Sequence, residues 1–236
     1  MIKISKYGSK TGAPSYNTHT SACPAADDAG CRDTCYVNGT YARFPGTAVA
    51  DLINLETTIE LLAAGKDIFK KALAISIRKI AANAQSFRIH ERGDFLSPEH
   101  FQAWMEVAKL FPRTHFWAYT KSYHAIGNTE IPANVTILIS LSVNDKERYH
   151  QAAWDFANER GLSIAYASAL KKTAMEFSKE AGLPILSCPE QLVNDKNFTC
   201  QDCRLCWEYP KRFIVFFKAH GKDRAKFKDW QLAKKG

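Results

Sequence analysis

The feature that most restricts the fold of this chain is an alternation of short apolar stretches with longer stretches of helical periodicity. The apolar stretches recur at roughly 20–30-residue intervals, and most precede a segment whose apolar residues repeat every three or four positions. This rhythm is typical of β/α units and predicts a parallel sheet. The predicted strands are Ile2–Ile4, Ser86–His90, Thr114–Tyr119, Val135–Leu141, Ser163–Tyr166 and Pro184–Leu186. The predicted helices are Ala48–Leu62, Ile68–Ala84, Pro98–Leu110, Asp145–Arg160 and Leu170–Ala181.

Two architectures fit this alternation, an open Rossmann-like sheet and a partial (β/α)6 barrel. Polar residues at the ends of several predicted strands favour the barrel, because barrels collect reactive groups at the carboxyl edge of different strands. No Gly-x-Gly-x-x-Gly motif follows the first predicted strand, which counts against a dinucleotide-binding fold. We therefore predict an α/β fold with a partial β/α barrel over residues 1–187 and a cysteine-rich C-terminal extension over residues 188–236.

Composition and the N-terminal segment predict a cytoplasmic protein with no membrane partner. The 236 residues, 46% of them hydrophobic, suffice for the core of one large domain. No stretch of about 18 apolar residues is present, and the N-terminal segment lacks the apolar core of a secretion signal. Seven cysteines, an odd number, in a reducing compartment indicate metal ligation or catalysis rather than a disulfide framework.

Four of the cysteines lie near the C-terminus in a Cys-x11-Cys-x2-Cys-x2-Cys pattern. Three thiols in one run with two-residue gaps, completed by a distant fourth, are characteristic of an iron–sulfur cluster such as [4Fe–4S]. A structural zinc ion is the alternative, although zinc prefers two paired Cys-x2-Cys units. The predicted ligands are Cys188, Cys200, Cys203 and Cys206.

The other three cysteines, Cys23, Cys31 and Cys35, lie in a long polar stretch from Lys6 to Thr47. Loops of this length are usually functional. Three thiols leave one coordination position open, for an exogenous ligand of a reactive cluster or for a protein side chain. With His19 as the fourth ligand, a closed structural zinc site is the alternative.

Ionisable residues at the ends of two predicted strands are the candidate catalytic groups. Glu91 and Asp94 follow the strand Ser86–His90, and Lys121 follows the strand Thr114–Tyr119. Carboxylates suit acid–base work, and a lysine binds phosphate or carboxylate as a point charge. Loops with internal ion pairs and a solvated lysine are the alternative interpretation.

Arg88 alternates with Phe87 and Ile89 along its predicted strand, so it faces either the barrel interior or the helices. Burial of its charge in the interior predicts a carboxylate partner.

The C-terminal segment is basic and aromatic. From Pro210 to Gly236 the chain has nine Lys or Arg and two Asp, a net charge of +7, against +8 for the whole chain. Such a segment predicts nucleic-acid contact, with basic residues on phosphates and aromatic residues on unpaired bases. The alternative is a last strand or helix whose aromatic residues pack on the core, and burial is favoured for Phe213–Phe217. The candidate phosphate-binding residues are Lys222, Arg224, Lys226 and Lys228.

Several of these motifs occur together in a known family. A cysteine-rich N-terminal loop, RIHERGDF (Arg88–Phe95), FWAYTKS (Phe116–Ser122) and SCP followed by CxxCxxCW (Ser187–Trp207) resemble the phage- and plasmid-borne gene product 88 family. That family looks distantly similar to the radical S-adenosylmethionine superfamily. The resemblance implies a six-unit β/α barrel, a three-cysteine loop after the first strand and S-adenosylmethionine bound to the open iron of a [4Fe–4S] cluster.

The sequence departs from the usual Cys-x3-Cys-x2-Cys of that superfamily, because Asn38 stands in the third position and Cys23 supplies the third thiol from upstream. The resemblance implies that Gly93 and Asp94 lie where the amine of the cofactor is contacted. Ser142, at the end of the predicted strand Val135–Leu141, is a further candidate cofactor-binding residue. If the clusters are redox-active, an electron donor is an expected partner. The predicted function is an iron–sulfur protein of a mobile genetic element that acts on nucleic acid or a nucleotide. The alternative is a non-catalytic nucleic-acid-binding protein whose metals only brace its loops.

Overall fold

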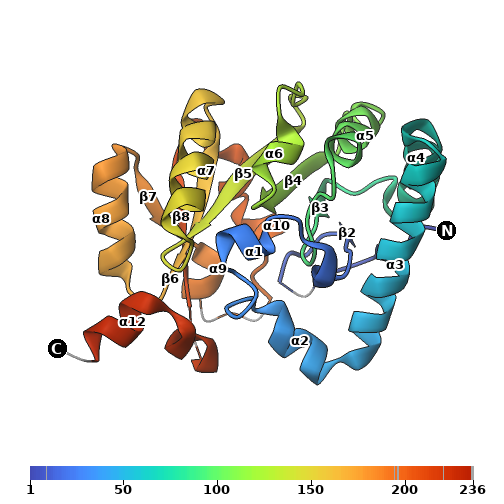
Figure 1. The fold of residues 1–236 in the computed structure, drawn as a ribbon. Coiled ribbons are helices and arrows are strands. Elements are labelled where there is room, and N and C mark those ends of the chain that lie inside the picture. Colours follow the sequence, from blue (N-terminus) through green and yellow to red (C-terminus); the bar gives the residue numbers. More distant parts are fainter. Residues whose placement is uncertain (9, 194, 196, 220, 235–236) are drawn as a thin grey trace.

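The computed structural model describes residues 1–8, 10–193, 195, 197–219 and 221–234. Its strands form one eight-stranded sheet in the order β1-β2-β3-β4-β5-β6-β8-β7 (Figure 1). Every neighbouring pair is parallel except β1 and β2, which are antiparallel. The strands are β1 (Ile4–Ser5), β2 (Ser15–Tyr16), β3 (Ser86–Ile89), β4 (His115–Thr120), β5 (Val135–Ser142), β6 (Ser163–Ser168), β7 (Ile185–Ser187) and β8 (Ile214–Lys218).

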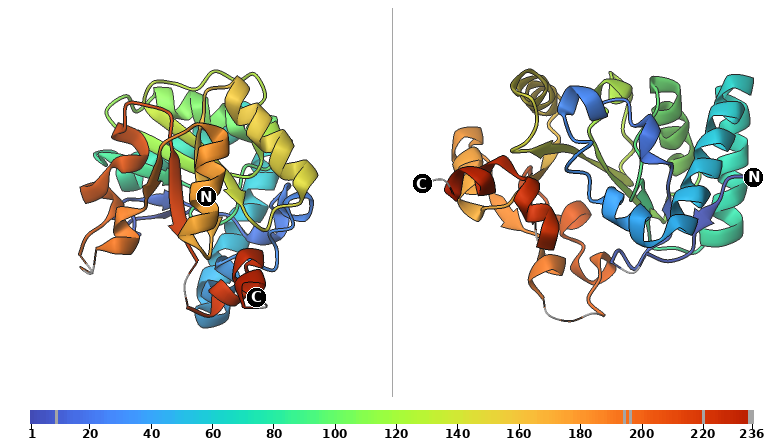
Figure 2. Two further views of the ribbon diagram at one scale, coloured as in Figure 1. Left: turned by 90° about the vertical axis from the view of Figure 1, so that its left-hand side faces the viewer. Right: turned by 60° about the horizontal axis from the view of Figure 1, so that its bottom comes forward.

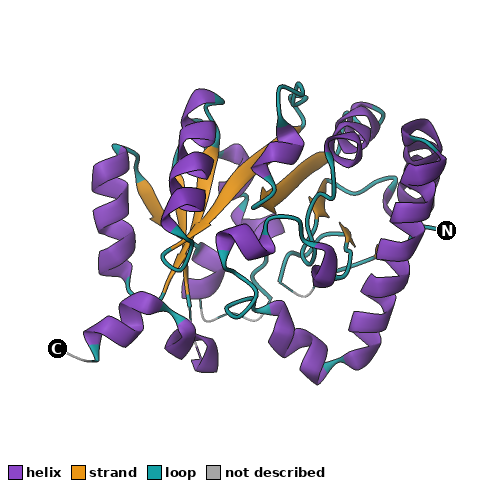
Figure 3. Cartoon of the chain, viewed as in Figure 1, coloured by secondary structure: helices purple, strands orange, loops and turns teal. Residues whose placement is uncertain are grey.

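The helices alternate with the strands from β3 onward, as predicted (Figure 3). Two of the predicted helix ends are confirmed: the Ser97 side chain accepts a hydrogen bond from the backbone N–H of His100, and Gly65 ends a long helix. The α-helices are α1 (Ala26–Ala29), α2 (Val37–Arg43), α3 (Pro45–Ala64), α4 (Lys66–Ala81), α5 (Pro98–Lys109), α6 (Tyr123–Ile126), α7 (Glu147–Glu159), α8 (Lys171–Ala181), α9 (Pro189–Leu192), α10 (Cys200–Cys203), α11 (Leu205–Glu208) and α12 (Lys228–Ala233). The 3-10 helices are η1 (Thr20–Ala22) and η2 (Gly221–Lys226).

The strands β2 to β6 follow one another in chain order, so their connecting helices line one face of the sheet (Figures 1 and 2). Right-handed crossovers that always step in the same direction require this placement. Alternate strand residues pack against these helices. Phe87 of β3 contacts Trp104 of α5 at a ring-centroid distance of 5.8 Å and Phe116 of β4 at 5.4 Å.

The opposite face, called here the inner face, is covered by the segment that connects β7 to β8. This connection steps back toward β6, and a right-handed crossover in the reverse direction must pass on the other side of the sheet. Trp207 of α11 packs on Trp117 of β4, with ring centroids 4.5 Å apart. A small hydrophobic cluster with Cys188 and Cys206 fills the space beside it.

The first predicted strand is misplaced in two respects. The strand at the N-terminus is Ile4–Ser5 rather than Ile2–Ile4, and it runs antiparallel to its neighbour. The first parallel strand is β2, inside the stretch predicted to be loop. It forms because Tyr16 is fully buried, with its hydroxyl 2.5 Å from Thr58 Oγ1, and because Ser15 and Tyr16 pair with the end of β3.

The α/β class is confirmed, whereas barrel closure is not seen. Among the described residues, β1 and β7 form the two edges of an open sheet. The order β6-β8-β7 also departs from the sequential order of a barrel. Because β8 lies inside the sheet, residues 188–236 complete the domain rather than extend it, and the division at residue 187 stays a prediction. No helix in the described part of the chain is long and apolar enough to cross a bilayer.

Candidate functional site

The N-terminal thiol group, defined as Cys23, Cys31 and Cys35, lies between β2 and α2. None of the three cysteines forms a disulfide, and all three are half-buried. Burial raises the pKa of Cys23, and the charges of Asp94, Cys35 and Cys31 raise it further. These influences link the three cysteines electrostatically with the end of β3. Asp94 lies just beyond β3, which places this group over the carboxyl edge of the sheet.

The loop that carries these thiols is held by backbone geometry and by α7. Helix α1 ends at Gly30, whose φ of +69° is readily adopted only by glycine, and the backbone N–H of Cys31 then donates to Ala26 O at 3.0 Å. Lys146, the residue before α7, donates from Nζ to Asp27 O at 2.6 Å. The position of Cys31 is therefore set by the sheet and not by the loop alone.

Asp94 joins the ends of β3 and β4. Its Oδ1 accepts from Thr120 Oγ1 at 2.6 Å and from the N–H of Phe95 at 2.8 Å. Its Oδ2 accepts from the N–H groups of Lys121 at 2.9 Å and Ser122 at 3.2 Å. Burial raises the pKa of Asp94, and these four donors oppose that shift. All four favour the charged carboxylate, so the side chain is well suited to hold the two strand ends together.

Lys121, another predicted site residue, lies at the same carboxyl edge and pairs with a buried carboxylate. Its ammonium lies 2.7 Å from Asp145 Oδ1, and only 1% of the Asp145 side chain is exposed. The other oxygen of Asp145 accepts from the N–H of Ser142 at 2.8 Å. Burial raises the pKa of Cys31, and the charge of Lys121 lowers it. Asp94, Lys121 and Ser142 are thus brought together at one edge, as the strand ends predicted.

Two residues of this edge were missed in the sequence. Asp145 was assigned to the start of a helix, and Tyr149, whose hydroxyl donates to Lys121 O at 2.6 Å, was not considered. The only signal was that Asp145 stands three residues beyond Ser142, at the same strand end.

Glu91 lies apart from the other two predicted catalytic residues. Its carboxylate accepts hydrogen bonds from Thr11 Oγ1 at 2.9 Å and Ser15 Oγ at 3.1 Å. It therefore braces the turn between β1 and β2. His90 precedes it with a φ of +58°, a conformation that redirects the chain at the end of β3.

Gly93 is required by a close backbone contact. Its φ is +82°, and a Cβ atom at this position would lie 2.6 Å from Thr18 O and even closer to the Thr18 hydroxyl. The chain leaving β2 thus rests directly on the turn after β3, at the base of the N-terminal thiol group. Whether Gly93 also contacts a cofactor stays a prediction.

His19, the predicted fourth ligand of a zinc site, begins η1 instead. Its Nδ1 lies 2.8 Å from Ser21 Oγ, and its ring stacks on Tyr41 at a centroid distance of 4.8 Å. These two contacts engage the imidazole ring of His19, as is usual for a histidine in a loop.

The C-terminal thiol group, defined as Cys188, Cys200, Cys203 and Cys206, lies on the inner face. All four thiols are free, and burial raises the pKa of Cys200 to about 12 and of Cys206 to about 11. The charges of Cys188 and Cys203 raise both pKa values further. Cys188 and Cys206 pack in one hydrophobic cluster. Tyr119 of β4 also belongs to this site, because its hydroxyl lies 2.9 Å from Cys206 Sγ.

Local structure explains how the two-residue gaps are used. Thr199 and Asp202 form a reciprocal capping box that starts α10 at Cys200. Arg204, with a φ of +53°, ends that helix and starts α11, so the chain turns between Cys203 and Cys206. The N–H of Cys200 donates to Lys10 O at 3.2 Å, which ties the segment to the turn between β1 and β2.

Both groups consist of cysteine side chains, which are the donors that iron–sulfur clusters and structural zinc ions use. Within the described residues, however, no three His, Cys, Asp or Glu side chains are arranged to hold a metal ion. Metal binding at either group therefore stays a prediction.

The basic tail is docked on the carboxyl edge of β5 and β6. Asn144 donates to Lys226 O at 3.0 Å and accepts from the N–H of Lys228 at 2.8 Å, and both lysines are exposed. Arg224 lies over the ring of Trp230 at 3.6 Å, and Phe227 is buried, so these two rings are already in contact with protein. The side chain of Lys222 lies outside the described part of the chain.

Burial of the apolar stretch before the tail is confirmed. Phe213 to Phe216 are buried, and Ile214–Lys218 forms β8. Phe217 is half-buried and packs on Tyr119 at a ring-centroid distance of 5.3 Å. The rings of Phe213 and Phe216 are therefore not available to stack on bases in this fold.

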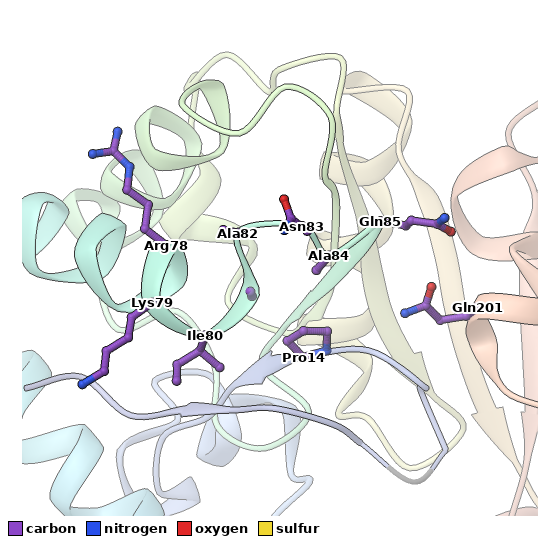
Figure 4. Close-up of a pocket in the computed structure, with 10 residues that line it drawn as sticks. Pro14, Arg78, Lys79, Ile80, Ala82, Asn83, Ala84, Gln85 and Gln201 are labelled. Carbon is purple, nitrogen blue, oxygen red and sulfur yellow. The ribbon is translucent and has the colours of Figure 1, made fainter.

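A hollow in the surface lies at the opposite edge of the sheet (Figure 4). Its volume is about 660 Å³, and Gln85 and Gln201 point toward each other across it. It is shallow, and it contains none of the predicted site residues. Parallel sheets bind ligands at the carboxyl ends of their strands, so this hollow is not the candidate site.

Fold and site together define an α/β protein whose single sheet carries two separate sets of cysteines, none of them in a disulfide. Within that class, the chain belongs to the gene product 88 family, whose sequence profile matches residues 5–209. It is 32% identical to the gene 88 protein of Mycobacterium phage L5 over 127 residues, which cover 51% of this chain and 49% of that protein. It is 31% identical to the gene 88 protein of Mycobacterium phage D29 over 128 residues, 51% and 50% of the two chains. The chain thus spans about half the length of the curated relatives it matches.

The family part of the resemblance is confirmed. No solved structure matches the chain, and neither the family profile nor the two phage proteins point to the radical S-adenosylmethionine superfamily. That part of the resemblance is therefore a proposal.

Proposed function

We propose that this phage-family protein is an iron–sulfur protein in which each thiol group binds one cluster, [4Fe–4S] in type. The observation that carries the proposal is that none of the seven cysteines forms a disulfide and that they lie in two segments far apart in sequence, with Cys188 and Cys206 packed in one cluster on the inner face. Uncrosslinked thiols gathered in this way are the ligands that iron–sulfur clusters use.

In this proposal the N-terminal thiol group holds the reactive cluster. Three thiolates leave one iron without a protein ligand, and S-adenosylmethionine is the exogenous ligand that the resemblance implies. When bound, such a cluster supplies an electron to its ligand. Three features support this assignment: the cysteine loop follows the first parallel strand, the strands β2 to β6 are wound in one direction as in a partial barrel, and Asp94 ends the second parallel strand.

The side chains around this group would bind and orient the ligand. Asp145 holds the Lys121 ammonium at this edge of the sheet, where it would contact an anionic part of the ligand. The charge of Lys121 lowers the pKa of Cys31. Asp94 fixes the backbone that carries Lys121, so it acts on the ligand through that residue. Glu91 holds the β1–β2 turn, and a catalytic role for it stays a prediction.

The test is anaerobic purification followed by optical spectroscopy and counts of iron, sulfide and zinc. We expect broad absorbance near roughly 400 nm and about eight irons per chain. Cys31→Ser should remove about half of the iron, and Cys203→Ser the other half, because each substitution affects one group. A colourless protein with one or two zinc ions, or with no metal, contradicts the proposal.

Catalysis is tested separately from cluster binding. Under reducing conditions we expect 5′-deoxyadenosine from S-adenosylmethionine with the wild-type protein and none with Cys31→Ser. Intact clusters without this product would remove the S-adenosylmethionine assignment and leave the clusters another role.

Nucleic-acid binding without catalysis is the second candidate function. It is supported by the exposed side chains of Lys226 and Lys228 at the same edge of the sheet as the N-terminal thiol group. In this candidate the metals, iron–sulfur or zinc, only brace the loops around that edge. Because two of the tail rings are already packed, contact with nucleic acid would be mainly electrostatic.

A further inference from the structure

The buried cation on the inner face is Arg88 of β3. Only 7% of Arg88 is exposed. Its guanidinium carbon lies 3.7 Å from the centroid of the Tyr119 ring and 5.9 Å from that of Trp117. Its Nε donates to His90 O at 3.2 Å. Arg88 therefore points into the site that contains the C-terminal thiol group, away from the helices packed on Phe87.

The carboxylate partner expected for an inward Arg88 is not there. Among the described residues, no Asp or Glu oxygen lies within 4.0 Å of its guanidinium. A buried charge without a counter-charge is strongly destabilising. Stacking on Tyr119 offsets only part of that cost. The remaining charge needs an anion.

The C-terminal thiol group can provide that anion. The Tyr119 ring that lies under the Arg88 guanidinium has its hydroxyl 2.9 Å from Cys206 Sγ. Cys188 packs in the same cluster as Cys206, so one side chain separates Arg88 from this part of the thiol group. Four thiolates outnumber the positive charge of a divalent ion or of an oxidised four-iron cluster. The loaded group is therefore anionic whichever metal it holds.

We propose that Arg88 is the charge partner of a metal–thiolate centre at the C-terminal thiol group, and that the Tyr119 hydroxyl donates to Cys206 Sγ in that centre. This inference rests on the proposed function, because it requires metal at that group. Arg88 and Tyr119 are positioning residues, which act on the metal through charge and hydrogen bonding. A guanidinium suits this position because its plane lies on the ring while its donors reach past the ring edge.

The experiment compares anaerobically purified wild-type protein with Arg88→Met, Arg88→Lys and Tyr119→Phe. Arg78→Met, on the exposed face of α4, is the matched control because it removes the same charge at a solvated position. The first measurement is the rate at which a chelator removes the metal from the C-terminal thiol group, in a background of Cys31→Ser. The second is a redox titration of the cluster, followed optically and by electron paramagnetic resonance.

We expect Arg88→Met to weaken metal retention about 10- to 100-fold, the range for loss of a partner adjacent to a metal ligand. Arg88→Lys should retain most of the affinity, and Arg78→Met all of it. The reduction potential should fall in Arg88→Met, because a nearby cation favours the more negative reduced state, and fall less in Tyr119→Phe. Circular dichroism shows whether Arg88→Met is folded, and if it is not, the comparison of Arg88→Lys and Tyr119→Phe with Arg78→Met decides.

The outcomes separate the inference from the proposed function. If wild-type protein binds metal and the Arg88 and Tyr119 variants match Arg78→Met in retention and potential, the inference is wrong and the proposed function stands. If the four cysteines bind zinc, the retention measurement still decides the role of Arg88, and only the iron assignment is lost. If wild-type protein holds no metal at these cysteines, both are overturned.

Discussion

Breaking the ion pair between Asp51 of α3 and Arg92 should lower the free energy of unfolding more than breaking most other interactions of the chain. Asp51 is buried, and its carboxylate accepts from Arg92 Nε at 2.6 Å and from the Tyr41 hydroxyl at 3.0 Å. The backbone carbonyl of Asp51 also accepts from the N–H of His19 at 3.0 Å. This pair therefore joins α3, the turn after β3 and the start of the N-terminal cysteine loop. We predict that Asp51→Asn lowers the free energy of unfolding substantially.

The magnitude follows from the burial of the two partners. Removing one member of a fully buried pair costs about 3–5 kcal/mol, because the other charge is left without a partner. Arg92 is 17% exposed, and the Glu91 carboxylate lies 3.6 Å from it, so water and that carboxylate partly compensate. A cost of about 2–3 kcal/mol is therefore expected. For a domain of this size the melting temperature should fall by about 5–10 °C.

The assay is urea unfolding of the wild type, Asp51→Asn, Arg92→Gln and the double variant. Because the two residues contact each other, the double variant should cost clearly less than the sum of the single ones. The control is Glu130→Gln, which breaks an exposed pair with Lys109 and should change the free energy by less than about 0.5 kcal/mol. Equal midpoints for Asp51→Asn and Glu130→Gln, or strict additivity in the cycle, would refute the reasoning.

Three further predictions concern pH, backbone and tail. Burial lowers the pKa of His100 to about 3, so protonation favours the unfolded chain as the pH falls below about 6.5. His100→Gln should therefore remove about 2 kcal/mol of the stability lost between pH 6.5 and 5. A urea midpoint that depends on pH as in the wild type would contradict this. Gly93→Ala should lower the free energy of unfolding by about 3 kcal/mol or more, because an added Cβ meets the backbone of Thr18. Gly161→Ala, at φ +64° with nothing near the added Cβ, should lower it by only about 1 kcal/mol. Equal losses in urea unfolding would count against the close contact at Gly93. If the tail binds duplex DNA, replacing Lys226 and Lys228 by Gln should lower the slope of log affinity against log salt by up to about 0.9 per lost contact, and an unchanged slope would remove the tail from the interface.

The regular part of the fold could be predicted because its signals are local. Helix α5 begins where Ser97 caps it, and α7 is followed by Gly161, a glycine with positive φ. Strand β2 could not be predicted in the same way. It is two residues long, and its place depends on pairing with Arg88 and Ile89, more than 70 residues away. Neither periodicity nor turn residues encode that pairing.

The candidate site was predictable to the extent that strand ends fix it. Asp94 and Lys121 meet because β3 and β4 are parallel neighbours whose carboxyl ends lie at one edge. Glu91 does not join them, because the positive φ of His90 redirects the chain and the Glu91 carboxylate turns toward Ser15. Asp145 was missed because its partner, the Lys121 ammonium, comes from a different strand end.

The position of β8 changes how the tail and the C-terminal thiol group can act. Because β8 lies between β6 and β7, a chain ending before it would lose an interior strand as well as the basic residues. Loss of DNA binding by such a truncation would therefore say nothing about the lysines, and only side-chain substitutions test them. The same topology places all four C-terminal cysteines between β7 and β8, in the connection that crosses the inner face. Metal bound there would cross-link the connection between β7 and β8. The free energy of metal binding would therefore stabilise this edge of the sheet.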